Sequence, residues 1–349
     1  MHEFPRKLIT EWRRLGLPIS GEPIIVAVSG GADSTALLLA MAELRRRKKF
    51  GQEMIAAHFN HKLRGVESDA DETYVRYLAS SLGVGFALGT GSLKGKSNLE
   101  ERARNSRYVF LADIAVQYGS RLILTAHTIN DQAETFLINL IRGSGPDGLA
   151  GMKPIRRLDR EVVVKESGKF EISDIKSQIE LVRPLLRWSK RSHTEEFCRE
   201  NGVEFRTDSM NDDPAFTRVR VRKSVLPMLA EINPRIVETL ARTAELLQFG
   251  SQSSASRMIS HDETDSQKPA ITMLLKELKP LESALLYAKL RSWLRSKRGN
   301  LRGLELKHIE AIERLIQSRK SGRIVELPAG ETVIKQGGML MWSKIKVEK

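Results

Sequence analysis

The chain has 349 residues, enough for two or three domains with a substantial core. Lysine and arginine outnumber aspartate and glutamate by 57 to 43, and the net charge of +14 favours an anionic partner, nucleic acid first among them, over a merely basic surface. Cys198 is the only cysteine, which excludes an intramolecular disulfide framework and a cysteine-rich zinc site.

The first residues, Met1–Lys7, carry early charge and no apolar run, unlike a secretory signal. No stretch approaches the roughly 18 to 20 uninterrupted apolar residues that a membrane span requires. We therefore expect a soluble, cytoplasmic protein with no membrane contact and no obligate protein partner.

The apolar run Ile24–Val28 ends at Ser29-Gly30-Gly31, and a helical stretch follows after Ala32-Asp33-Ser34. β-branched and small apolar residues in a row predict a strand buried on both faces, as in a parallel sheet. Paired glycines permit a tight turn, and the unpaired N–H groups at the helix start suit a phosphate. An ordinary turn capped by Asp33 or Ser34 is the alternative. The whole string favours the phosphate site, and it matches neither the P-loop lysine motif nor the dinucleotide fingerprint.

Further apolar runs occur at Met54–Phe59 and Leu122–Ala126. They alternate with segments of helical periodicity at 36–47, 67–82, 98–118 and 132–142. This alternation predicts an α/β fold, with a Rossmann-like parallel sheet and helices on both of its faces.

The pattern of apolar and charged residues changes after residue 155. Residues 156–179 resemble a hairpin-like excursion with a turn at 167–169, and the segments 181–186 and 203–207 flank a helix near 189–201. A helical region begins at Pro214, a serine-rich connector covers 251–266, a helix covers 304–318, and short strands cover 323–327, 332–335 and 339–343. We predict a catalytic domain at 1–213, a helical substrate-binding region at 214–300 and a small C-terminal α+β domain at 301–349.

Polar strings follow two of the predicted strands, at His58–Gly65 and at Thr125–Thr135. Ligands of open α/β sheets lie beyond the carboxyl ends of the strands, so both strings are expected beside the phosphate loop. The paired histidines of the first string lack further zinc ligands nearby. Asp131 and Glu134 lie three residues apart near a helix start, where helix capping by Asn130 or Asp131 is compatible with ligand binding.

The segment Asn98–Tyr108 places Arg104 and Arg107 on adjacent faces of a helix. Such a helix either presents a solvated basic face or contacts phosphate, and the sequence favours neither.

Together these strings resemble the tRNA(Ile)-lysidine synthetase family of PP-loop ATP pyrophosphatases. The resemblance covers nearly the whole chain and includes the segments 29–34, 58–65, 98–108, 125–135, 142–152, 183–186 and 208–213, Arg218, Arg222 and Pro227, and the tail from Leu327. It departs from the family at Asn130, where an aspartate is usual, in the long excursion 156–179, and in a tail with one small C-terminal domain.

The resemblance implies an enzyme that ligates L-lysine to C2 of the wobble cytidine in isoleucine tRNA with a CAU anticodon. ATP activates the base as an adenylate, so the implied cofactors are ATP and Mg²⁺, and the implied partners are this tRNA and lysine. The product, lysidine, converts codon specificity from AUG to AUA.

Carried onto this chain, the resemblance assigns three sets of site residues. Catalytic roles fall to Asp33, Arg107, His127 and Asp131, with Asp33 as the magnesium ligand. ATP binding falls to Ser29, Gly30, Gly31, Ala32, Asp33, Ser34, His58, Asn60 and Arg104. Lysine or cytidine binding falls to Asp131, Glu134, Arg142, Arg183 and Arg218.

Three alternatives share parts of these features. A tRNA thiolase with the same loop needs at least two cysteines, and Cys198 alone argues against it. An amidating synthetase for a small molecule would not need a net charge of +14. A non-catalytic basic RNA-binding protein would not retain the intact phosphate loop.

Overall fold

The computed structural model describes residues 1–62, 65–91, 99–158, 179–206, 216–259, 272–281, 283–299, 301, 303–318 and 320–344. The chain forms two compact units. The first comprises Met1–Glu134 and Met152–Ala241, and the second comprises Thr135–Gly151 and Arg242–Lys349. The three-part division of the sequence stays a prediction, and its first boundary lies within 207–215, outside the described residues.

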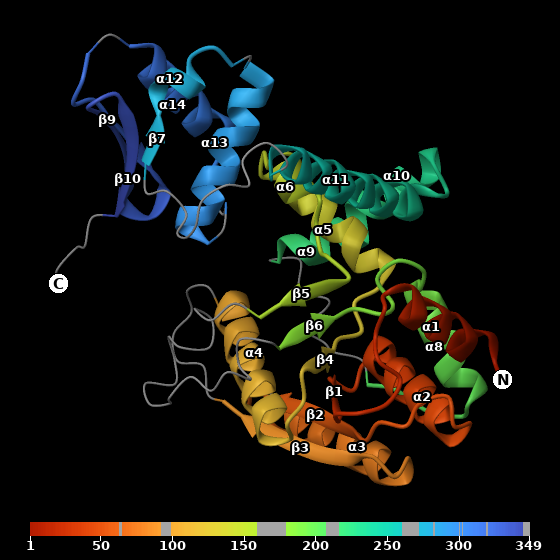
Figure 1. The fold of residues 1–349 in the computed structure, drawn as a ribbon. Coiled ribbons are helices and arrows are strands. Elements are labelled where there is room, and N and C mark those ends of the chain that lie inside the picture. Colours follow the sequence, from red (N-terminus) through yellow and green to blue (C-terminus); the bar gives the residue numbers. More distant parts are fainter. Residues whose placement is uncertain are drawn as a thin grey trace. The chain divides into compact units, whose positions relative to one another are not determined.

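A six-stranded sheet in the order β3-β2-β1-β4-β6-β5 forms the centre of the first unit (Figure 1). Its strands are β1 (Ile24–Ala27), β2 (Met54–Asn60), β3 (Gly85–Thr90), β4 (Leu122–Leu124), β5 (Ile155–Arg157) and β6 (Glu180–Val182). Paired strands are parallel except β5, which runs antiparallel to β6. Ile24 pairs with Met54 on one side and with Leu122 on the other. The predicted parallel sheet is confirmed.

Helices cover both faces of this sheet, as predicted, because successive side chains of a strand point to opposite faces. Ile24 and Val26 share a core with α1 (Glu3–Arg14), α2 (Ala32–Arg46), α3 (Val66–Ser81) and α8 (Arg191–Glu200). Ile25 shares a second core with α4 (Leu99–Gln117), which lies on the other side of the sheet (Figure 1).

The structure corrects the sequence-based prediction in several places. The edge strand β3 was not predicted because two of its six residues are glycines and its burial is incomplete. The strand predicted at 122–126 is therefore the fourth in chain order. Residues 203–206, part of the segment expected after the helix at 189–201, form no strand, and the Arg206 N–H donates to the Gly30 carbonyl (2.9 Å).

The strands at the two ends of the predicted excursion at 156–179 pair with each other as the strands of a hairpin do. β5 and β6 pair in antiparallel register, with Ile155 opposite Val182 and Arg157 opposite Glu180. The turn predicted at 167–169 lies outside the described residues.

Short helices follow β6 and α8 in the first unit. They are α9 (Thr217–Arg220), a π-helical turn at Val221–Val225, and α10 (Leu226–Ile232). Two longer helices, α5 (Ile129–Ile141) and α11 (Ile236–Ile259), begin in the first unit and end in the second. Since α11 extends to Ile259, the first part of the connector predicted at 251–266 is helical; residues 260–266 lie outside the description.

The second unit contains an antiparallel sheet in the order β7-β10-β9-β8. Its strands are β7 (Thr272–Leu274), β8 (Ile324–Leu327), β9 (Glu331–Gln336) and β10 (Met339–Lys344), and its helices include α6 (Pro146–Leu149), α12 (Leu275–Leu278), α13 (Ser283–Arg298) and α14 (Leu306–Gln317). Leu290, Ile312 and Val333 are buried in its core. The predicted C-terminal α+β arrangement is confirmed. None of the helices in the described ranges has the length and apolar character needed to cross a bilayer.

Candidate active site

The phosphate loop is a closed turn between β1 and α2. Gly31 is the N-cap residue of α2, so the first N–H groups of that helix are free to face a ligand. The Ser29 N–H donates to Ser34 Oγ (3.1 Å), and the Ser34 hydroxyl donates to the Gly31 carbonyl (3.0 Å). These bonds hold the loop in shape without using the N–H groups at the helix start. The geometry suits a phosphate group, as expected for a helix N-terminus that follows a glycine pair.

Gly30 occupies a backbone conformation that other residues rarely adopt, with φ of +94°. We predict that Gly30→Ala lowers the free energy of unfolding, measured without nucleotide, by about 1–3 kcal/mol because of this backbone strain. Gly31→Ala is the matched control, since Gly31 has φ of −71° and an added Cβ would meet only ordinary contacts. Equal destabilisation by the two substitutions would contradict the assigned strain.

The end of β2 contributes His58 and Asn60, both buried. His58 Nδ1 donates to the Val28 carbonyl (2.8 Å), and burial lowers the pKa of this imidazole. The Asn60 amide donates to the Ser68 carbonyl and to the carboxylates of Asp69 and Glu72 (3.2, 3.0 and 3.2 Å). Asn60 thus ties the strand end to α3, while His58 ties it to β1.

A cavity of 340 Å³ opens at the carboxyl ends of these strands. Its lining brings together groups from the phosphate loop, β2, α4 and the segment after β4. The predicted site residues that line it are Ser29, Asp33, Ser34, His58, Asn60, Arg107, His127 and Asp131. The segment after β1 and the segment after β4 therefore meet where the sequence analysis expected.

A second cavity of 220 Å³ shares two lining residues, Asp33 and Asp131, with the first. Its other polar walls are Thr128, Asn130, Glu134, Arg191 and Arg222, and its apolar wall is formed by Leu226, Pro227, Ala230 and Val237. Two carboxylates thus lie between a cavity that contains the phosphate loop and a cavity that contains charges of both signs.

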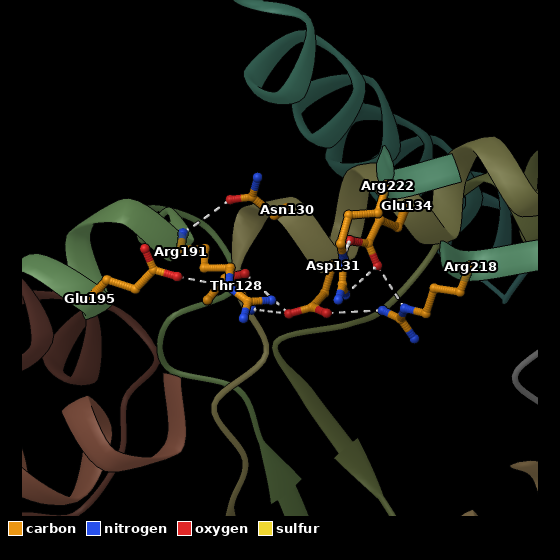
Figure 2. A network of polar contacts seen from close by, with 8 residues as sticks. All are labelled: Thr128, Asn130, Asp131, Glu134, Arg191, Glu195, Arg218 and Arg222. Carbon is orange, nitrogen blue, oxygen red and sulfur yellow. Dashed lines mark hydrogen bonds and ion pairs between the residues drawn. The ribbon is translucent and has the colours of Figure 1, made fainter. Parts of the chain in front are cut away.

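Glu134 is the centre of the polar network in Figure 2. Its side chain is 2% exposed and pairs with Arg218 Nε (2.6 Å) and with Arg222 Nε and Nη2 (2.6 and 3.1 Å). Arg218 Nη2 also reaches Asp131 Oδ1 (3.0 Å). Asp131 Oδ2 accepts from the N–H and hydroxyl of Thr128 (2.8 and 3.1 Å), so Asp131 caps α5 as well.

Arg222 was missing from the predicted site residues. A signal for it exists in the spacing: Arg218 and Arg222 are four apart, and Asp131 and Glu134 are three apart. The π-helical turn at Val221–Val225 widens the helix beside Arg222, a feature often seen at functional sites.

Asp33 lies at the start of α2 and touches α8. The Thr194 hydroxyl lies 2.5 Å from Asp33 Oδ1. Burial raises the pKa of Asp33 to about 6, the Thr194 hydrogen bond opposes this, and the neighbouring Asp131 charge raises the pKa further. Burial also raises the pKa of Asp131, but Arg218 and then His127 outweigh it, so the net pKa of Asp131 is lowered. The negative charges of Asp33 and Asp131 lie close together, and a bound cation would stabilise both.

His127 lines the larger cavity, and Thr125 Oγ1 is 2.9 Å from its Nδ1. Burial lowers the pKa of His127, an effect that Asp131 opposes and that Arg183 and Arg218 reinforce. The imidazole is therefore neutral near pH 7, which allows it to exchange hydrogen bonds without adding positive charge.

The lowered pKa of His127 predicts a pH dependence of stability. Below the unfolded value of about 6.5, the unfolded chain binds a proton that the folded chain does not, so folding stability falls with falling pH. We expect His127→Gln to remove part of this slope, at most about 1.4 kcal/mol per pH unit. Urea unfolding of both proteins across this window measures it. Parallel loss of stability in the two proteins would show that folded His127 also takes up the proton.

The remaining predicted residues lie elsewhere. Arg104 and Arg183 surround Tyr108 together with Arg107. Arg142 is exposed and belongs to the second unit. Gly30, Gly31 and Ala32 belong to the phosphate loop itself. Within the described ranges, no group of three or more His, Cys, Asp or Glu side chains is arranged to hold a metal ion.

These features define an α/β nucleotide-binding protein whose phosphate loop follows the first strand of a parallel sheet. The family model of the PP-loop domain matches residues 6–229. The chain belongs to this PP-loop family.

Several relatives carry the name tRNA(Ile)-lysidine synthase, including the following two. The protein of Dehalococcoides mccartyi is 36% identical over 330 residues, covering 90% of this chain and 65% of the relative. The protein of Geobacter sulfurreducens is 35% identical over 324 residues, covering 88% of this chain and 62% of the relative. The chain thus spans slightly less than two thirds of the length of these relatives.

Among solved structures, the U34-tRNA thiolase of Methanococcus maripaludis with its [4Fe-4S] cluster is similar to this chain. The two chains share 14% sequence identity and a TM-score of 0.52, and the match covers 76% of this chain and 80% of the thiolase. At this identity the similarity concerns the fold.

Proposed function

We propose that the protein ligates L-lysine to C2 of the wobble cytidine in isoleucine tRNA with a CAU anticodon, in an ATP-dependent reaction that forms lysidine. The observation that carries the proposal is the pair of adjoining cavities with a shared carboxylate wall. One cavity contains the phosphate loop, and the other suits a charged amine substrate. The names of the relatives support the same reaction, and the proposed location is the cytoplasm.

The reaction has two steps. The cytidine O2 attacks the α-phosphate of ATP, the bond to the β-phosphate breaks, and pyrophosphate leaves. The lysine amine then attacks C2, AMP leaves with the O2 oxygen, and the amine loses a proton. Both steps develop negative charge on phosphate oxygens, which the N–H groups at the start of α2 and the Arg107 guanidinium in the cavity wall would stabilise.

Asp33 fits a magnesium site. Mg²⁺ takes one or two protein carboxylates together with phosphate oxygens, and Asp33 lies in the cavity beside the loop with Asp131 as its neighbour. When bound, Mg²⁺ would neutralise phosphate charge. Such a site uses only one or two protein carboxylates. It therefore needs no group of three or more His, Cys, Asp or Glu ligands, and the described residues contain none.

The smaller cavity suits an amino acid. Asp131 offers negative charge to an ammonium group, Arg191 and Arg222 offer positive charge to a carboxylate, and Leu226 and Val237 border the space for an aliphatic stem. Because Arg218 and Arg222 neutralise Glu134, we assign the ammonium to Asp131, and give Glu134 the role of holding the two arginines.

Specific observations argue against the two alternative enzymes. A thiolase needs reactive sulfur, but Cys198 is buried, its thiol donates toward the Ala32 carbonyl (3.6 Å), and burial raises its pKa to about 12. A small-molecule amidating synthetase leaves the charge of +14 without a role.

An exchange assay separates these functions. Labelled pyrophosphate should be incorporated into ATP only when isoleucine tRNA with a CAU anticodon is present, and without any need for lysine. Exchange that does not depend on tRNA would support a small-molecule synthetase instead. No exchange, combined with tight RNA binding, would support the non-catalytic RNA-binding protein.

A further inference from the structure

Four arginine side chains surround the ring of Tyr108 in the first unit. Arg104 and Arg107 come from α4, Arg156 comes from β5, and Arg183 follows β6. The guanidinium carbons of Arg104, Arg107 and Arg156 lie 5.4, 5.9 and 5.9 Å from the centre of the Tyr108 ring. We call these five residues the arginine cluster.

Several buried donors of the arginine cluster have no partner. Arg183 is 2% exposed; its Nη1 donates to the Lys153 carbonyl (2.7 Å), but its Nε donates to nothing. Arg156 Nε and Tyr108 Oη are likewise buried without a hydrogen bond. Buried polar groups in folded proteins are nearly always satisfied, so unmet donors at one place indicate an acceptor that binds there.

Among the described residues, the arginine cluster also has no counterion. Within the part of the chain that the structure describes, none of its four arginines forms a salt bridge with a carboxylate. Burial, reinforced by the neighbouring Arg156 and Arg104, lowers the pKa of Arg183 to about 10. Burial raises the pKa of Tyr108, but the surrounding arginines outweigh it and lower the pKa. The arginine cluster is therefore cationic at neutral pH, and a bound anion would stabilise it.

The chemistry of the donors points to phosphate. A guanidinium presents its N–H groups in a planar fork that matches two oxygens of a phosphate, and phosphate has enough acceptor positions for several such groups. The Tyr108 hydroxyl supplies one further donor.

The place of the cluster in the sheet separates it from the phosphate loop. The loop follows β1 and Arg183 follows β6, with β4 between these strands. Strands lie about 4.8 Å apart, so the two strand ends are roughly 10 Å apart. Arg107 and Tyr108 nevertheless line the same cavity as the loop. The cluster thus borders the cavity on a side that the loop does not occupy.

We propose that the arginine cluster binds a backbone phosphate of the RNA substrate next to the base that enters the cavity. This inference rests on the proposed function, since it takes the base as the cytidine that is adenylated. It adds Tyr108 and Arg156 to the site and gives Arg104 and Arg183 a shared ligand. Phosphate contacts of this kind position RNA without reading its sequence.

The test uses Arg156→Gln in the full-length protein, with Arg157→Gln as the matched control, because Arg157 is the exposed neighbour on β5. Affinity for an anticodon stem-loop RNA with CAU is measured over a range of salt concentrations, and affinity for a non-hydrolysable ATP analogue is measured alongside. We expect Arg156→Gln to weaken RNA binding about tenfold and to reduce the salt slope by about 1, with unchanged binding of the ATP analogue. Tyr108→Phe, which removes only the hydroxyl, should weaken RNA binding in the same direction.

Three results would overturn the inference. If Arg156→Gln and Arg157→Gln bind RNA equally, the cluster holds no RNA phosphate. If the ATP analogue alone loses affinity, the phosphate belongs to the nucleotide. If the wild-type protein fails to bind the CAU stem-loop at all, the proposed function fails together with the inference. The first two results, by contrast, overturn the inference alone.

Discussion

Replacing Glu134 with glutamine is expected to lower the free energy of unfolding by about 3 kcal/mol. The Glu134 side chain is 2% exposed and pairs with both Arg218 and Arg222, which are 29% and 28% exposed. Removing the carboxylate charge leaves Arg222 without its counterion and leaves Arg218 with Asp131 alone. The cost lies near the lower end of that for a broken buried ion pair, because both guanidinium groups keep some contact with water. Urea unfolding measures the loss.

Glu43→Gln is the matched control for this substitution. Glu43 also pairs with an arginine, Arg47 (2.7 Å), but Arg47 is 41% exposed at the C-cap of α2, and the pair joins residues four apart. Such pairs contribute about 0.5 kcal/mol or less. If both substitutions destabilise the protein equally, the network around Glu134 is no more important than a surface pair.

Asp131→Asn is expected to slow lysine transfer about 100-fold while leaving tRNA-dependent ATP–pyrophosphate exchange within about threefold. Asparagine can still accept the hydrogen bonds from Thr128, so the cap of α5 survives. The lost charge is the one that we assign to the lysine ammonium. Single-turnover transfer from the preformed tRNA adenylate, compared with exchange, measures the two steps separately.

Equal loss of both steps would contradict this assignment and would place Asp131 in the activation of the base. Asp69→Asn serves as the control, because Asp69 makes comparable polar contacts, to Lys62 and Asn60, but does not line either cavity. Its substitution should change neither step.

The sheet and the phosphate loop could be predicted because their signals are local. The run Ile24–Val28 is apolar throughout, and β1 is accordingly buried on both faces. Gly30 and Gly31 lie directly beside it in the sequence. Amphipathic α1 buries Phe4, Leu8 and Trp12 at spacings of four, a periodic pattern that the sequence analysis left unassigned.

The contacts that complete the site could not be predicted, because they join distant segments. Thr194 and Asp33 are separated by 161 positions, and Arg222 and Glu134 by 88. Nothing local to Thr194 distinguishes it from other helical threonines. The sequence therefore indicated that Glu134 lies near a ligand, but not that two arginines neutralise it.

Incorporation of lysine into tRNA tests the central claim most directly. The protein is incubated with ATP, Mg²⁺, labelled lysine and isoleucine tRNA with a CAU anticodon, and the tRNA is then digested to nucleosides. We expect label in the wobble nucleoside and none when that cytidine is replaced by uridine. Unlabelled tRNA despite consumption of ATP, or lysine label that does not depend on tRNA, would contradict it.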